Sequence, residues 1–189
     1  RPLRARSTLT GLARSGAEAY ALSIGVTDPH LRAQLFSADA QRELNGYVAE
    51  ERWWRTMANA PALEPLDAAQ YADMKIALPG DILTKVDRMS MAVSLEAREP
   101  LLDHHLVEFA ATLPANLRVR GSTGKYLLKK SMERYLPRDI LYRQKMGFVT
   151  PISAWFRGPL AQQARSLAAS PTLARTGWFD MNAIDALVT

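Results

Sequence analysis

Cysteine is absent from the 189 residues of the chain. Its absence excludes disulfide bonds, thiolate metal sites and a cysteine nucleophile, and it gives no sign of an oxidising compartment. The sequence also lacks a run of about 18 apolar residues, the length that a membrane-spanning helix needs. Residues 1–10 lack the apolar stretch of a signal peptide. We therefore expect a cytoplasmic protein with no membrane partner.

Positive charge is in excess, with a formal net charge of +5. Many basic residues fall in one stretch, at Arg118, Arg120, Lys125, Lys129, Lys130, Arg134, Arg138, Arg143 and Lys145. This stretch would attract an anion such as nucleic acid. Scattered basic residues are more commonly a solvated helix face, however, and aromatic residues that stack on bases are not interleaved with them. We therefore expect no nucleic-acid partner.

The sequence pattern is helical, because short segments with apolar residues at helical spacing alternate with turns rich in proline, glycine and asparagine. No long alternation of apolar and polar residues indicates a sheet, so we predict an all-α fold. Residues Asp28, Ser37 and Asp103 are placed to open helices as N-caps. The expected helices cover 29–36, 37–45, 46–55, 67–78, 79–93, 104–113, 125–136, 159–169 and 180–188, with a flexible loop over 121–124.

We expect a single helical unit over residues 1–189. Within it, residues 1–65 would form N-terminal helices, 66–160 would carry the motifs described below, and 161–189 would form C-terminal helices. The connector at 60–65, which contains two prolines, is the predicted internal boundary.

Two loops contain candidate functional residues. The segment Gly121–Lys125 departs from a Walker A motif, which has four residues between its glycines and a Ser or Thr after the lysine. It is therefore either a plain turn or a loop in which Lys125 contacts an anion at a helix N-terminus. The segment Arg143–Phe148 (RQKMGF) contains Lys145 and is either a surface turn or a functional loop.

Charged and apolar residues are mixed between Asp81 and Asp103, a pattern that predicts partly buried ion pairs. One face of the helix expected over 79–93 is apolar, and the opposite face carries Lys85, Asp87 and Arg88. Glu96 and Arg98 follow in an irregular segment. A carboxylate with a guanidinium partner there is either structural or catalytic.

No metal is expected in this chain. Its histidines are His30, His104 and His105, and they have no metal-ligand spacing with acidic partners.

Two runs carry a resemblance to a known family: residues 78–92 (LPGDILTKVDRMSMA) and 94–103 (SLEAREPLLD). They resemble the synthetase domain of glutamine-dependent asparagine synthetases. The later pairs Gly124-Lys125 and Leu136-Pro137, and the RQKMGF segment, occur in the family's order and approximate spacing. The N-terminal RPLRAR sequence is similar to a subgroup of amidotransferases associated with bacterial exopolysaccharide and exosortase loci.

The resemblance implies that ATP activates a carboxylate, such as that of aspartate, as an acyl-adenylate, and that ammonia from glutamine then forms the amide. It implies that Lys145 neutralises charge on the α-phosphate or pyrophosphate, and that Glu96 orients the amine or accepts its proton. Lys125 would be a second phosphate contact. The residues expected to hold the site together are Asp87, Arg88, Arg98 and Asp103.

The same resemblance implies that this chain is the helical C-terminal portion of a nucleotide-binding synthetase domain related to the adenine-nucleotide α-hydrolases. Members of the family carry an N-terminal cysteine nucleophile, a pyrophosphate loop with adjacent glycines and a later glycine-rich acidic segment that supplies a magnesium ligand. This chain has no cysteine and no two adjacent glycines. ATP and magnesium would therefore belong to the whole enzyme, and we expect the fragment to bind neither and to be inactive.

Two other hypotheses stay open at this stage. The chain could be a helical interaction module in an exopolysaccharide or protein-sorting system, which would not need Glu96 and Lys145 to converge. Nucleic-acid binding through the basic stretch is the other hypothesis, and it would be sensitive to salt. A homo-oligomer is a further expectation, because a helical portion without its sheet would expose apolar surface.

Overall fold

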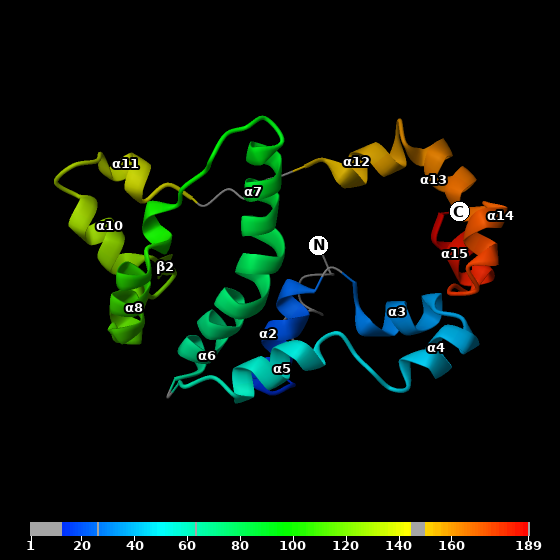
Figure 1. Cartoon of the computed structure of the whole chain (residues 1–189), viewed down its shortest axis with the longest axis horizontal. Helices are drawn as coiled ribbons and strands as arrows, with labels where there is room; N and C mark the ends of the chain where they lie inside the picture. Colours follow the sequence, from blue (N-terminus) through cyan, green and yellow to red (C-terminus); the bar gives the residue numbers. More distant parts are fainter. Residues whose placement is uncertain (1–12, 26, 63, 145–149, 189) are drawn as a thin grey trace. The chain divides into compact units, whose positions relative to one another are not determined.

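The computed structural model describes residues 13–25, 27–62, 64–144 and 150–188. Its contacts divide the chain into two units, one formed by residues 1–20 and 52–145 and the other by residues 21–51 and 146–189. Within the described residues, short helices dominate both units (Figure 1), and the one sheet has two strands, so the all-α prediction is confirmed. None of the described helices has the length and apolar character needed to cross a bilayer.

The first unit contains the elements α5 (Glu51–Ala58), α6 (Pro65–Ala72), η1 (Asp73–Leu83), α7 (Thr84–Met91), η2 (Pro100–Leu102), α8 (His104–Thr112), α9 (Ala115–Arg118), β1 (Val119–Arg120), β2 (Thr123–Gly124), α10 (Tyr126–Met132) and α11 (Arg138–Leu141). The second unit contains α3 (Pro29–Leu35), α4 (Ala38–Leu44), α12 (Ile152–Arg157), α13 (Ala161–Ala168), α14 (Pro171–Arg175) and α15 (Met181–Val188). Helix α2 (Gly16–Ile24) has residues in both units, and Glu51, the first residue of α5, is assigned to the second unit.

A single long helix runs through α6, η1 and α7, from Pro65 to Met91, and Figure 1 shows it as one unbroken coil. The prediction that a second helix begins at Pro79 is therefore wrong. The middle segment η1 is a π-helix with Pro79 inside it. Proline has no N–H to donate, and its ring would crowd the carbonyl four residues earlier in an α-helix. The wider π turn accommodates the ring, and the hydroxyl of Thr84 donates to the Pro79 carbonyl at 2.6 Å.

The segment predicted as a flexible loop at 121–124 is instead the end of a short hairpin. Strands β1 and β2 pair antiparallel, with Val119 opposite Gly124 and Arg120 opposite Thr123. The turn between them contains Gly121 at φ +58°, a left-handed conformation that glycine adopts without steric cost. The hairpin therefore sets the direction in which the chain enters α10.

Several helix ends follow from their capping residues, as predicted. The carboxylate of Asp28 accepts from the N–H groups of His30 and Leu31 at the start of α3. The hydroxyl of Ser37 accepts from the N–H of Ala40 at the start of α4. Each side chain satisfies N–H groups that have no partner inside the helix.

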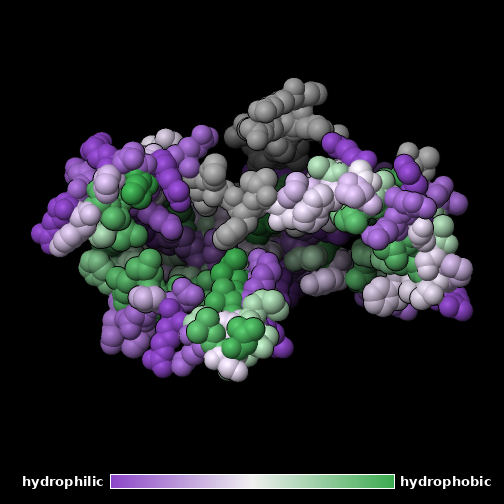
Figure 2. All heavy atoms as spheres, turned by 90° about the horizontal axis from the view of Figure 1, so that it is seen from above, coloured by the Kyte–Doolittle hydropathy of each residue, from purple (hydrophilic) through white to green (hydrophobic). Residues whose placement is uncertain are grey.

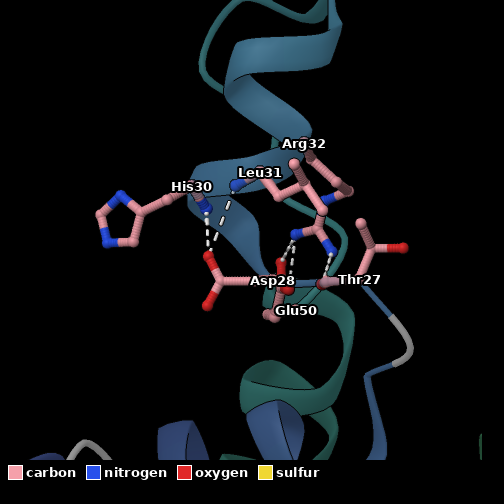
Figure 3. A network of polar contacts seen from close by, with 6 residues as sticks. All are labelled: Thr27, Asp28, His30, Leu31, Arg32 and Glu50. Atoms are coloured by element: carbon pink, nitrogen blue, oxygen red, sulfur yellow. Dashed lines mark hydrogen bonds and ion pairs between the residues drawn. The ribbon is translucent and has the colours of Figure 1, made fainter. Parts of the chain in front are cut away.

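In the second unit, α3 is connected to the segment before α5 by one ion pair. Arg32 donates to both carboxylate oxygens of Glu50, at 2.5 and 2.6 Å, and also to the carbonyl of Thr27 at 3.0 Å (Figure 3). In the same unit the rings of Phe36 and Phe179 stack with centroids 6.1 Å apart. These contacts join segments that are distant in the sequence.

In the first unit, two polar contacts join helices that are distant in the sequence. The Tyr20 hydroxyl of α2 donates to the carboxylate of Asp73 at 2.6 Å, and the Tyr20 ring packs edge-on against Trp53. Arg118 of α9 reaches α6, where it pairs with Asp67 and donates to the side-chain oxygen of Gln70 at 2.5 Å. Both contacts stabilise the N-terminal half of the long helix.

Few side chains are buried among the described residues. The buried hydrophobic residues are Ala21, Ala72 and Ala168, and Glu50 is the buried charged residue. Large apolar side chains are exposed instead, including Met89 at 71% and Val93 at 74%, and Figure 2 shows hydrophobic residues, in green, reaching the surface in several places. An exposed apolar surface of this kind is typical of a region that packs against another protein segment.

Candidate functional site

The irregular segment after α7 contains the candidate pair Glu96 and Arg98. The Nε of Arg98 donates to Oε1 of Glu96 at 2.9 Å, so the structure brings these two residues together. Their side chains are 67% and 83% exposed, which shows that the expected partial burial of this pair is wrong. An ion pair in water contributes about 0–1 kcal/mol to stability. The pair is therefore available to a ligand and adds little to the fold.

Asp103 has a clear local role. Its carboxylate accepts from the N–H groups of His105 at 3.0 Å and Leu106 at 3.3 Å, and α8 begins directly after it. The predicted cap is confirmed. The capping contact also fixes the point at which the chain turns from the Glu96 segment into α8.

Asp87 and Arg88 lie on α7, and both are exposed. Their neighbour Lys85 forms an ion pair with Asp81 one turn earlier, also in water. Within the described part of the chain, the side chains of Asp87 and Arg88 form no ion pair or hydrogen bond with each other or with Glu96. Their charges are therefore free to contact a ligand or another protein segment.

Lys125 stands between β2 and α10 with φ +55° and ψ +39°. A residue with a Cβ atom pays a steric cost in this left-handed conformation, and such outliers cluster at functional positions. The conformation follows from the tight hairpin before it, which must turn directly into the helix. Lys125 is exposed, and its ammonium makes no ion pair with another residue that the structure describes.

Lys145 lies outside the described residues. So do residues 146–149, which complete the RQKMGF segment and extend one residue beyond it. The described part of that segment is Arg143 and Gln144, which follow α11 and are exposed. Convergence of Lys145 with Glu96 therefore stays a prediction.

Tyrosines accompany the basic stretch, so the expectation that no aromatic residues are interleaved with it is wrong. The guanidinium of Arg134 lies 4.5 Å from the Tyr135 ring centre, and that of Arg138 lies 5.0 Å from the Tyr142 ring centre. Glu133 accepts from Lys130 at 2.7 Å and from the Tyr142 hydroxyl at 2.8 Å, and these hydrogen bonds lower the pKa of Glu133. Part of the positive charge is thus compensated inside the stretch itself.

The chain is similar to proteins of one family. A family model described as asparagine synthase matches residues 4–189. Glutamine-hydrolysing asparagine synthetase 1 of Bacillus subtilis is 38% identical over 102 residues, which cover 54% of this chain and 16% of that protein. The glutamine-hydrolysing asparagine synthetase of Gallus gallus is 34% identical over 132 residues, which cover 65% of this chain and 22% of that protein.

A relative with a different name shows that the similarity extends beyond asparagine synthetases. The amidase chyE of Penicillium rubens is 30% identical over 126 residues, which cover 63% of this chain and 19% of that protein. The chain thus spans about a fifth of the length of the curated relatives it matches. No solved structure matches it.

Proposed function

This chain belongs to the asparagine synthase family, and we propose that it forms the helical part of a synthetase site in which ATP activates a carboxylate for amide formation. The observation that carries the proposal is the family match over residues 4–189 together with the exposure of Glu96 and Lys125. Side chains that contribute little to the fold, such as Glu96 and Lys125, are the ones that a ligand can use.

The proposed chemistry has two steps. The carboxylate oxygen of the substrate attacks the α-phosphorus of ATP, which forms an acyl-adenylate and releases pyrophosphate. Ammonia, supplied from glutamine, then attacks the acyl carbon. The bond between the acyl carbon and the bridging oxygen breaks, and AMP leaves with that oxygen. After the attack the nitrogen carries a positive charge, and the proton that it loses as the amide forms needs an acceptor near the acyl carbon.

Residues of this chain have distinct roles in that scheme. Lys145 neutralises charge on the α-phosphate and on the departing pyrophosphate, a preorganised electrostatic contribution. Lys125 contacts a phosphate from the start of α10. Glu96 orients the amine or accepts its proton, and Arg98, which donates a hydrogen bond to Glu96 at 2.9 Å, orients that carboxylate. Asp87, Arg88 and Asp103 support this arrangement.

The proposed setting is a nucleotide-binding domain of the adenine-nucleotide α-hydrolase type, whose sheet and phosphate loop the described residues do not include. The exposed apolar side chains of Ile82 and Met89 on the long helix, and of Val93 in the turn after it, would pack against that part of the domain. ATP and magnesium would bind mainly through residues outside this chain. We therefore propose that the chain alone is inactive, since it contains no adjacent glycines for a phosphate loop and no cysteine for glutamine hydrolysis.

Pyrophosphate release by the complete protein that carries this chain tests the proposal. The assay contains ATP, magnesium, aspartate and ammonia, and compares wild type with Glu96→Gln, Lys145→Ala and the control Lys129→Ala, which changes a lysine of the same basic stretch outside the motif. We expect large losses of turnover for the first two variants and near-normal turnover for the control. Unchanged turnover in both motif variants would favour a helical interaction module instead.

A further inference from the structure

A cavity of about 340 Å³ lies between α5 and the junction of α6 with η1, entirely within the first unit. It is open to solvent and is lined by Arg52, Arg55, Thr56, Asn59, Tyr71, Lys75 and Ile76. Its volume falls in the range of small-molecule sites, which is about 300–1,000 Å³. None of the residues that the sequence analysis selected lines it.

The lining of the cavity is strongly basic. Three of its side chains carry positive charge, and none is acidic. Among the residues that the structure describes, the guanidinium of Arg52 and the ammonium of Lys75 are paired with no carboxylate. The Lys75 ammonium lies 5.6 Å from the centre of the Tyr71 ring. Two cations without counter-ions in a hollow attract an anion from solution.

Helix geometry explains why these side chains meet. Residues 52, 55 and 56 of α5 and residue 59 in the turn directly after it fall on one face, because neighbours three, four and seven positions apart share a face of an α-helix. On the other wall, Tyr71, Lys75 and Ile76 lie four and five positions apart, where α6 passes into the π-helix η1. The wider turn of a π-helix brings position 76 over position 71, and such turns are frequent at functional sites.

On the wall formed by α6 and η1, the acidic residue closest in sequence to Lys75 is occupied elsewhere. Asp73, two positions before Lys75, accepts the hydrogen bond of the Tyr20 hydroxyl at 2.6 Å and does not line the cavity. This bond also fixes the first turn of η1, which carries Lys75. Asp73 therefore does not neutralise the charge of Lys75, and the segment that carries Lys75 is held in place.

We propose that this cavity binds a small soluble anion with a phosphate or diphosphate group. The Arg52 guanidinium offers paired N–H donors that match phosphate oxygens, the Lys75 ammonium adds a point charge, and the Asn59 amide and Thr56 hydroxyl supply further polar contacts. Its lining residues include none of the residues to which we assign a role in the synthetase site, so the proposal goes beyond the proposed function.

Calorimetric titration of the complete protein with inorganic phosphate and with pyrophosphate, at constant ionic strength, tests the site. We expect the double variant Arg52→Gln/Lys75→Gln to weaken binding by about tenfold or more, since each lost charge removes a charge-assisted contact. Asn59→Asp should weaken it similarly by placing a negative charge in the cavity, whereas Asn59→Ala should have a small effect. All these side chains lie on the surface, and circular dichroism checks that each variant stays folded.

Control variants separate this site from the other basic regions. Arg134→Gln removes a cation of the basic stretch and should leave the affinity unchanged. Absence of measurable binding would overturn the proposal. So would binding that is lost in Lys145→Ala but kept in the Arg52/Lys75 double variant, because the anion would then occupy the proposed synthetase site. Loss of synthetase activity has no bearing on these readouts.

Discussion

Arg32 contacts both carboxylate oxygens of Glu50, at 2.5 and 2.6 Å, and Glu50 is the most enclosed charged side chain in the described structure, at 8% exposure (Figure 3). A carboxylate removed from water in this way depends on its partner. The pair therefore contributes to the structure of the second unit more than the exposed ion pairs of the chain do.

Replacing Arg32 with alanine should destabilise the protein by about 2–3 kcal/mol, because the buried Glu50 carboxylate would lose both hydrogen bonds from the guanidinium. Arg42→Ala is the matched control. Arg42 pairs with Asp39 in the same unit, but both side chains are more than 70% exposed, and its loss should cost less than about 0.5 kcal/mol. Urea denaturation measures both effects, and equal losses for the two variants would contradict the prediction.

Tyr20 should make the free energy of unfolding depend on pH in the alkaline range. Burial and its hydrogen bond to Asp73 raise the pKa of Tyr20 above its usual value. The folded state therefore favours the protonated phenol. The stabilising contribution of this phenol is complete below the pKa of tyrosine in the unfolded chain, which is about 10. Above that pH the unfolded chain loses the proton first, so stability falls as pH rises towards the folded pKa.

The variant Tyr20→Phe should be less stable than wild type at neutral pH, by about 1 kcal/mol, because it lacks the hydrogen bond. Its stability should then decline less steeply above pH 10. Tyr47→Phe, which changes an exposed tyrosine, serves as control and should keep the wild-type slope. Thermal unfolding at a series of pH values measures the slopes, and parallel curves for wild type and Tyr20→Phe would refute the effect.

Lys125 should be a position where function opposes stability. Its left-handed backbone, at φ +55°, costs free energy for a residue with a Cβ atom, so Lys125→Gly should stabilise the fold by about 0.5–1 kcal/mol. Lys129→Gly, inside α10, should instead destabilise it by about 1 kcal/mol. Denaturation midpoints compare the two. Equal destabilisation of the fold by Lys125→Gly and Lys129→Gly would show that the backbone of Lys125 is not strained.

The apolar side of the long helix should promote self-association of the isolated chain. The double variant Met89→Ser/Val93→Ser removes the two most exposed large apolar side chains of the helix and the turn after it, and should reduce the apparent mass at high concentration in light scattering. Lys85→Ser changes a charged residue on the same helix and should have no such effect. A clean monomer for the wild-type chain at all concentrations would contradict this prediction.

The sequence predicted local features well, because capping depends on neighbouring residues alone. Asp28, Ser37 and Asp103 were identified as caps, and all three accept the expected backbone hydrogen bonds. The break predicted at Pro79 was wrong, because a proline usually ends an α-helix. The π-helical turn that accommodates it depends on the wider helix around it and has no simple sequence signal.

Contacts between distant segments could not be predicted in the same way. Tyr20 and Asp73 are 53 positions apart, and Arg118 and Asp67 are 51 apart, so no periodicity relates them. The basic cavity was missed for the same reason, since its two walls come from separate helices. The exposure of the Glu96–Arg98 pair was also missed, because mixed charged and apolar residues are equally compatible with a buried and a solvated pair.

Exchange of labelled pyrophosphate into ATP by the complete protein, with aspartate present and ammonia absent, tests the adenylation step directly. We predict exchange that depends on the carboxylate substrate, that is lost in Lys145→Ala and that is retained in the Lys129→Ala control. Exchange of equal rate in wild type and Lys145→Ala would contradict the proposed role of this chain in carboxylate activation.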